Sequence, residues 1–172
     1  MSATATDPFA LAIAACGDAT VGYATAVLEP IPGEVFAHLP HAEVNHPAFV
    51  VGHLGLYLNK TLELVGRSDL CVAVPYEVAT FEDGAPCVEQ DGRYPGKDVL
   101  LPYFLGHSKT MLDAVRATPT ETFAAENPME GRMKEMFPTI GVAVNFLCNN
   151  HVMMHLGQIS AWRRLMGLGS AM

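Results

Sequence analysis

The sequence predicts an all-α protein: a four-helix bundle with long connecting loops, formed by residues 1–172 as a single domain. Three observations predict this fold class. Four segments carry apolar residues at helical spacing, proline and glycine mark the ends of those segments, and no segment shows the alternating pattern of a strand. Half of the residues are hydrophobic and 16% are charged, which favours a folded core.

The first expected helix covers residues 8–28. Asp7 can cap its N-terminus, Pro8 suits the first helical position, and Pro30 ends the helix. A proline-rich link, PIPGEVFAHLPHAEVNHP, then leads to the second expected helix, residues 47–65.

The second helix has Asn45 or His46 as its cap and Gly66 at its end. His53 and Tyr57 are one turn apart and therefore share one face of this helix. We expect that face to be buried or functional.

A long loop and a third helix follow. Residues 67–97 are rich in turn residues and have little periodicity of either kind, and loops of this length are often functional. We expect this loop to line a substrate entrance. The third helix, residues 99–116, places Tyr103 and His107 on one stripe, and Pro102 is expected to distort its start.

The last part of the chain predicts another loop and the longest helix. Residues 118–137 form a loop that can hold a short helical turn, and residues 139–166 form the fourth helix. This helix ends in Arg163, Arg164 and glycines, as helix C-termini commonly do, so we assign the two arginines a structural role.

Charge and composition exclude several classes of function. The formal net charge of −8 disfavours binding to a nucleic acid, whose phosphates attract clusters of Lys and Arg. No Lys or Arg precedes Lys60, whereas a signal peptide needs a basic first segment, and the purely apolar runs are too short to span a membrane. The four cysteines form no C-x-x-C motif. We therefore expect a cytoplasmic protein with reduced thiols that binds neither nucleic acid nor membrane.

The last helix carries two histidines, His151 and His155, one turn apart. At about 100° of rotation per residue, both lie on the apolar stripe, while Asn149, Arg163 and Arg164 lie on the opposite side. The pair therefore faces the interior of the bundle, where unpaired imidazoles are costly.

Two explanations of this pair are open. The histidines can be core residues hydrogen-bonded to backbone or water, or they can be metal ligands, which would need a third protein group from another helix. His53 is the natural third ligand, and His107 is a weaker one. Gly52 and Gly55 beside His53 indicate either a close approach at the site or ordinary tight packing.

Three segments carry a resemblance to a known family: HPAFVVGHLGLY, RYPGKDVLLPYF and PTIGVAVNFLCNNHVMMHLGQISAWRRLMGL. Over nearly its whole length the chain resembles the DinB/YfiT-like superfamily of metal-dependent enzymes. The resemblance implies a four-helix bundle, often dimeric, in which His53, His151 and His155 hold one metal ion. The family commonly has polar or acidic residues between the last two histidines, and here these residues are apolar.

The resemblance also implies a function. A three-histidine site leaves a coordination position open, which is typical of catalytic sites. We expect a divalent transition metal, zinc or nickel, that activates a thiol or water, in a thiol-dependent S-transferase or a hydrolase acting on a small molecule. The partners expected are that substrate, a low-molecular-weight thiol and a second copy of the chain.

Four further residues are candidates for the pocket or for support of the ligands: Gln158, Tyr57, Tyr103 and His107. Gln158 can hydrogen-bond a ligand histidine or close the bundle interior, and the tyrosines can equally be packing residues. The alternative function is a non-catalytic binding or interaction module whose histidines serve only the core. Metal content distinguishes the two.

Overall fold

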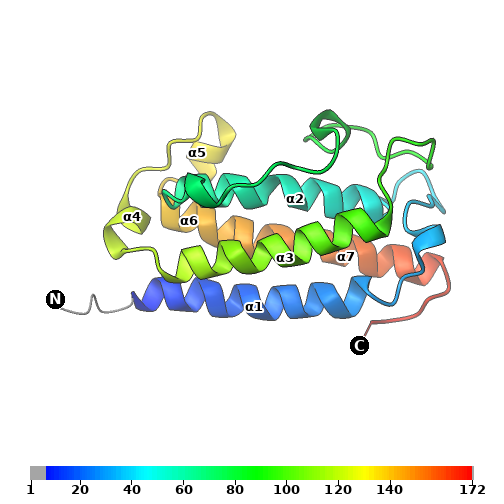
Figure 1. Ribbon diagram of the computed structural model, residues 1–172, viewed down its shortest axis with the longest axis horizontal. Coiled ribbons are helices and arrows are strands. Elements are labelled where there is room, and N and C mark those ends of the chain that lie inside the picture. Colours follow the sequence, from blue (N-terminus) through cyan, green and yellow to red (C-terminus); the bar gives the residue numbers. More distant parts are fainter. Residues whose placement is uncertain (1–6, 172) are drawn as a thin grey trace.

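The computed structural model describes residues 7–171 and is all-α, as predicted (Figure 1). The long elements are α1 (Pro8–Leu28), α2 (Pro47–Leu64), α3 (Lys97–Arg116), α6 (Ile140–Asn145), a π turn (Phe146–Asn150) and α7 (His151–Leu165). The short ones are α4 (Thr120–Ala124), α5 (Arg132–Met136) and three 3-10 turns (Gly33–Val35, Ser68–Leu70 and Val78–Thr80). Within the described range, extended pairing is limited to one isolated bridge between Glu126 and Thr139.

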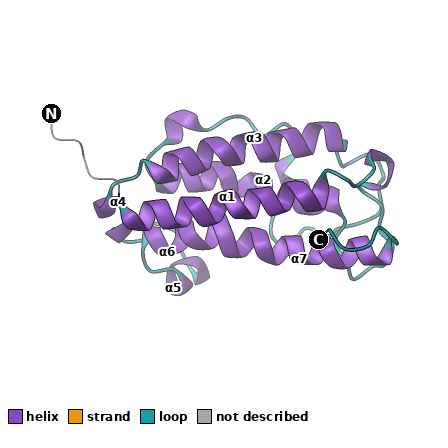
Figure 2. Ribbon diagram, turned by 90° about the horizontal axis from the view of Figure 1, so that it is seen from below, coloured by secondary structure: helices purple, strands orange, loops and turns teal. Residues whose placement is uncertain are grey.

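The long elements pack side by side. α1 contacts α3 on one flank and the arm formed by α6, the π turn and α7 on the other, and α2 contacts the same two neighbours (Figure 2). One core lies between them, and its largest fully buried side chains are Trp162, Phe36, Phe81, Phe104, Leu28, Ile31, Leu54, Leu62, Leu100, Leu112, Leu156 and Ile159. Residues 1–6 and 172 of the expected domain lie outside the described residues.

The helix caps follow the sequence. The Asp7 carboxylate accepts a hydrogen bond from the backbone N–H of Phe9 at 2.8 Å, with Pro8 in the first turn of α1. At α2, His46 and not Asn45 is the cap. The predicted starts of both helices are therefore confirmed.

The helix count differs from the four predicted. The expected fourth helix is interrupted by the π turn, and the stretch 118–137 holds the two short helices α4 and α5. α3 begins at Lys97, earlier than expected, and continues through Pro102, which lies in its second turn and removes the one i→i−4 hydrogen bond to the carbonyl of Asp98.

The π turn changes which residues share a face. Phe146 and His151 are five positions apart, so in an unbroken α-helix their side chains would point about 140° apart. In the π turn, residues five positions apart lie over one another. The two rings are accordingly stacked, with centroids 5.6 Å apart and 25° between their planes.

Arg163 does not lie on a solvent-facing side, as the helical projection predicted. Its side chain is 5% exposed and donates to the carbonyl oxygens of Val27 at 2.9 Å and Leu168 at 3.3 Å. Arg163 thus supplies hydrogen bonds to carbonyls near the ends of α1 and α7. The periodicity of one helix cannot predict these contacts, because they depend on the neighbouring segments. The expected structural role of this arginine is consistent with these contacts.

Within the described residues, α1 is the one helix long and apolar enough to cross a membrane, with a mean hydropathy of 1.5. Core helices of bundles share these properties, and α1 buries Ala10, Ile13 and Ala24 against its neighbours. Only 39% of the apolar window is buried, so this packing accounts for part of the apolar composition of α1.

The long loop between α2 and α3 is fastened to the N-terminus of α2. His46 is fully buried, its Nδ1 accepts from the N–H of Phe49 at 3.1 Å, and its Nε2 donates to the carbonyl oxygen of Val88 at 2.9 Å. Both ring nitrogens are therefore committed in the neutral form, because a protonated Nδ1 could no longer accept from Phe49.

This arrangement predicts a pH dependence of stability. Burial lowers the pKa of His46 below its ordinary value of 6.5, so the stability contributed by the neutral ring is present above that value and is lost as the pH falls below it. His46→Asn keeps a capping residue but removes this titration. Between about pH 8 and about pH 5 its urea unfolding midpoint should fall less than that of the natural protein. The exposed His41→Asn change should leave this pH dependence of the unfolding midpoint unaltered. If the midpoint of His46→Asn falls as much as that of the natural protein, the role assigned to His46 is wrong.

Candidate metal centre

Three histidines, one from α2 and two from α7, converge inside the bundle. The Nε2 atoms of His53 and His151 lie 3.3 Å apart, and those of His151 and His155 lie 3.1 Å apart. The residues are 4%, 6% and 9% exposed. Their ligand atoms all lie within 4.8 Å of one another, and the group could hold a metal ion. The expected convergence is observed.

Hydrogen bonds at the outer edge of two rings determine which nitrogen carries the proton. Nδ1 of His53 lies 2.8 Å from the carbonyl oxygen of Phe81, so this nitrogen is the donor. Nδ1 of His155 lies 3.1 Å from Oε1 of Gln158 and donates to it. A neutral imidazole with its proton on Nδ1 has a lone pair on Nε2. Both rings therefore direct a lone pair toward the centre of the cluster.

This arrangement suits a cation. If Nε2 of His151 carries a proton, it can donate fully to only one of its two neighbours, and the other contact leaves an acceptor unpaired. An added proton is disfavoured, because burial first, and then His155 and His53, lower the pKa of His151 to about 3. Nitrogens about 2.05 Å from a tetrahedral zinc ion lie about 3.3 Å apart. Two of the three separations in the cluster are close to this value, and the third is within 4.8 Å.

His151 is oriented by packing and not by a hydrogen bond. Its Nδ1 is buried and has no hydrogen-bond partner among the described residues. The ring stacks on Phe146, which stacks in turn on Phe137 with centroids 4.3 Å apart, and Tyr57 meets it edge-on at 4.6 Å. The π turn aligns Phe146 with His151 and so orients this ring by packing, whereas hydrogen bonds orient the rings of His53 and His155.

Glycines on α2 let the long loop reach His53. A Cβ at Gly52 would overlap the ring of Phe81, and a Cβ at Gly55 would overlap the hydroxyl of Tyr76. That hydroxyl donates to the carbonyl oxygen of Gly52 at 2.7 Å. The two glycines thus serve a close approach of the loop, and this approach supplies the carbonyl that orients His53.

Two cavities meet at the cluster, and His53, His155 and Asp83 border both. The smaller cavity, of about 170 Å³, is also lined by Asn45 and by Glu82, Gly84 and Ala85 of the long loop. The larger cavity, of about 480 Å³, is walled mainly by apolar side chains of α5 and of the arm formed by α6, the π turn and α7. The loop expected at the entrance thus contributes residues 82–85, and α5 contributes the opposite wall.

The other candidate residues divide into two groups. Tyr57 lines the larger cavity, and Gln158, which also accepts from Asn45 Nδ2 at 3.3 Å, lies behind His155. Tyr103 and His107 line neither cavity: Nε2 of His107 lies 2.8 Å from Oδ1 of Asn59, and Tyr103 packs against it. The stripe that these two residues share faces the interface of α3 with α2.

Several residues of the site escaped sequence reasoning. Asp83 lies in the turn of the long loop, where the letters FEDG signal a turn but no role. Burial, followed by this carboxylate, raises the pKa of Tyr57, so the tyrosine hydroxyl keeps its proton. Phe81 acts through its backbone, and Arg132 belongs to a stretch that the sequence presents as a loop. Neither kind of contribution has a sequence signature.

A family model described as the DinB superfamily matches residues 18–159. The match covers most of the chain and includes all three histidines, so the protein belongs to the DinB superfamily. No curated protein and no solved structure matches the chain.

The close approach at Gly52 generates a prediction about metal affinity. Gly52→Ala should displace the Phe81 ring and with it the carbonyl that orients His53. Loss of such outer partners of a metal ligand typically lowers metal affinity about 10- to 100-fold. We expect a loss in this range, measured by competition with a chelating indicator.

Gly157→Ala is the matched control, because this glycine is also helical but a Cβ there meets nothing within 4 Å. It should leave affinity unchanged and raise stability by up to about 1 kcal/mol. Equal affinities of the two variants would contradict the role assigned to Phe81.

Proposed function

We propose that this protein is a metal-dependent enzyme that holds a divalent transition metal, zinc or nickel, on His53, His151 and His155. The observation that carries the proposal is a buried three-histidine cluster bordered by two cavities. A hydrolase needs space for one substrate and water, whereas a transferase needs space for two substrates. The paired cavities therefore favour thiol-dependent S-transfer to a small molecule, and hydrolysis is the second candidate.

When bound, such a metal lowers the pKa of a coordinated thiol or water and so supplies a nucleophile at neutral pH. The protein itself keeps the imidazoles of His53, His151 and His155 neutral and oriented toward the centre of the cluster. Burial holds the pKa of His151 and His155 below the ordinary value, so their Nε2 lone pairs stay available at neutral pH. Phe137 and Phe146 give the larger cavity apolar walls, so a substrate that fills it would displace water and strengthen electrostatic interactions there.

Asp83 is the group proposed to move the proton. Its carboxylate borders both cavities and can accept the proton from the sulfur of an entering thiol. The sulfur then forms a bond to the electrophilic carbon of the second substrate, the bond to the leaving group breaks, and the proton passes from Asp83 to the leaving group. Electrons and protons balance without a further reactant.

The competing hypothesis is a non-catalytic interaction module with core histidines. It predicts purified protein without stoichiometric transition metal and without loss of stability in the presence of a chelator. The enzyme hypothesis predicts the opposite in both measurements. Elemental analysis and thermal unfolding with and without chelator therefore separate the two.

His151→Ala removes a ligand and should abolish both metal binding and turnover while helical content is retained. The affinity loss should exceed the about 10- to 100-fold typical of outer partners. Turnover is measured by screening electrophiles with several small thiols, and esters and amides without thiol, using metal-loaded protein.

The exposed His41→Ala change is the control and should behave as the natural protein does. Activity that persists in His151→Ala, or in fully metal-stripped protein, would show that the mechanism is wrong. Activity on esters without any thiol would favour the hydrolase over the transferase.

We further propose a cytoplasmic homodimer in which the arm formed by α6, the π turn and α7 serves as the fourth helix of the family's bundle. The exposed face of α1 supports a dimer, because it is almost entirely apolar or small: Phe9, Leu11, Ala12, Ala15, Ala19, Gly22 and Ala26. Phe9 is 46% exposed and Leu11 is 42% exposed, which leaves apolar area for a second copy to cover.

Leu11→Glu should convert the dimer to a monomer in light scattering, since a charge would be buried without a partner at the interface. Val72→Glu places the same charge on a similarly exposed residue of the long loop and should remain dimeric. A monomeric natural protein at working concentration would remove this proposal.

A further inference from the structure

The larger cavity beside the histidines combines apolar walls with a single Lys or Arg side chain, Arg132. Its volume of about 480 Å³ falls within the range of about 300–1,000 Å³ typical of small-molecule pockets. Met133, Met136, Phe137 and Phe146 contribute much of the wall. A ligand that fills it therefore has an apolar body.

Arg132 has no ion pair and no hydrogen-bond partner among the described residues, although most other arginines of the chain are paired. Arg132 lines the cavity, and its unpaired guanidinium can bind an anion there. The formal net charge of −8 repels anions from the protein as a whole, so an anionic substrate would need such a local cation.

The segment that carries Arg132 is fastened to the bundle. Asn127 is fully buried, and its Nδ2 donates to the carbonyl oxygens of Phe137 at 2.8 Å and Met133 at 3.4 Å. Lys134 and Glu126 form an ion pair at 2.7 Å across the base of the same segment. α5 is therefore positioned over the cavity by specific contacts, and Arg132 with it.

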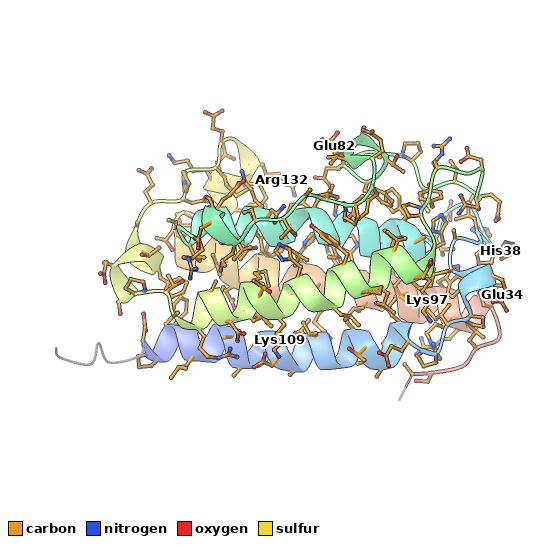
Figure 3. All side chains as sticks on the ribbon, viewed as in Figure 1. Glu34, His38, Glu82, Lys97, Lys109 and Arg132 are labelled. Carbon is orange, nitrogen blue, oxygen red and sulfur yellow. The ribbon has the colours of Figure 1, made fainter. Side chains whose placement is uncertain are left out.

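Asp83 is the opposing charge at this cavity. It borders the histidines, so near them the charge of a dipositive ion outweighs it, and Arg132 adds a further positive charge. Figure 3 shows Arg132 at α5 and Glu82, the neighbour of Asp83, in the long loop, both toward the upper side of the view. With metal bound, the cavity favours an anion.

We propose that the substrate of the larger cavity is a small molecule with an apolar body and one anionic group, such as a carboxylate, bound by Arg132. This inference rests on the proposed function, because it places the reacting end of the molecule at the three histidines. The anionic group belongs either to the thiol or to the electrophile.

The test uses Co²⁺-loaded protein, whose visible spectrum changes when a thiolate binds. The probes are ω-mercaptoalkanoates of increasing length and the matched neutral ω-mercaptoalkanols. The acid should bind about tenfold more tightly than the alcohol once the chain is long enough to reach Arg132. Each methylene buried against the apolar wall should add about threefold to fourfold in affinity.

Arg132→Met should abolish the preference for the acid and leave the affinity of the alcohol unchanged, and Arg132→Lys should retain part of it. Lys109→Met is the control for net charge, since Lys109 lies on α3, lines neither cavity and appears well away from Arg132 in Figure 3. An equal preference in the natural protein and in Arg132→Met would overturn the proposal.

A thiol-free alkanoate, added beside mercaptoethanol, locates the anionic group. If Arg132→Met weakens this alkanoate more than the mercaptoalkanoate, the electrophile carries the anion, and the reverse order assigns it to the thiol. Either order supports the proposal, and no effect on either probe overturns it.

Calorimetry of the alkanoate and the matched alkanol with metal-free protein keeps the test independent of the metal. Protein that takes up no Co²⁺ but still distinguishes acid from alcohol through Arg132 contradicts the proposed function and supports the binding site. If the protein binds Co²⁺ and thiols but does not distinguish acid from alcohol, the proposed function is supported and the proposed substrate class is overturned.

Discussion

The structure depends on the convergence of three imidazole nitrogens inside the bundle, on residues that are less than 10% exposed. His53 and His155 each direct an Nε2 lone pair at the centre, and His151 lies between them at 3.3 and 3.1 Å. Lone pairs that face one another in a core are costly unless a cation or a hydrogen-bond donor pairs with them. The surrounding residues make sense as supports that keep these three rings in place.

Each of the three histidines is held in a different way. His53 is oriented by a backbone carbonyl from the long loop, His155 by the amide of Gln158, and His151 by a stack of aromatic rings. The loop carbonyl requires small residues on α2, and the aromatic stack requires the π turn. Two features that weaken an isolated helix, glycine and a π turn, thus coincide with the site, as is common where function competes with regular packing.

The chemistry of the site follows from its two cavities. One is small and bordered by acidic and amide groups, and the other is larger, apolar and supplied with one guanidinium. Asp83 stands where they meet, beside two of the histidines. The two spaces share His53, His155 and Asp83, and this sharing is the basis on which we propose transfer between two small molecules.

The sequence by itself determined the helical class, the starts of α1 and α2, the family and the three histidines. Helical periodicity and capping are local properties, and a pair of histidines one turn apart is visible in the letters. The third ligand could be named because the resemblance supplied it and because His53 lies on an inner face.

Tertiary structure alone decided the rest. Phe81 contributes a carbonyl group, which every residue has, so no letter marks it. Phe146 reaches His151 only because a π turn replaces α geometry, and Asp83 and Arg132 come from segments far apart in the chain that the fold brings to one cavity. Arg163 is buried because the ends of α1 and α7 offer it carbonyls. Local patterns report the face that a residue occupies within its own helix, whereas the partners on that face depend on contacts between segments distant in sequence.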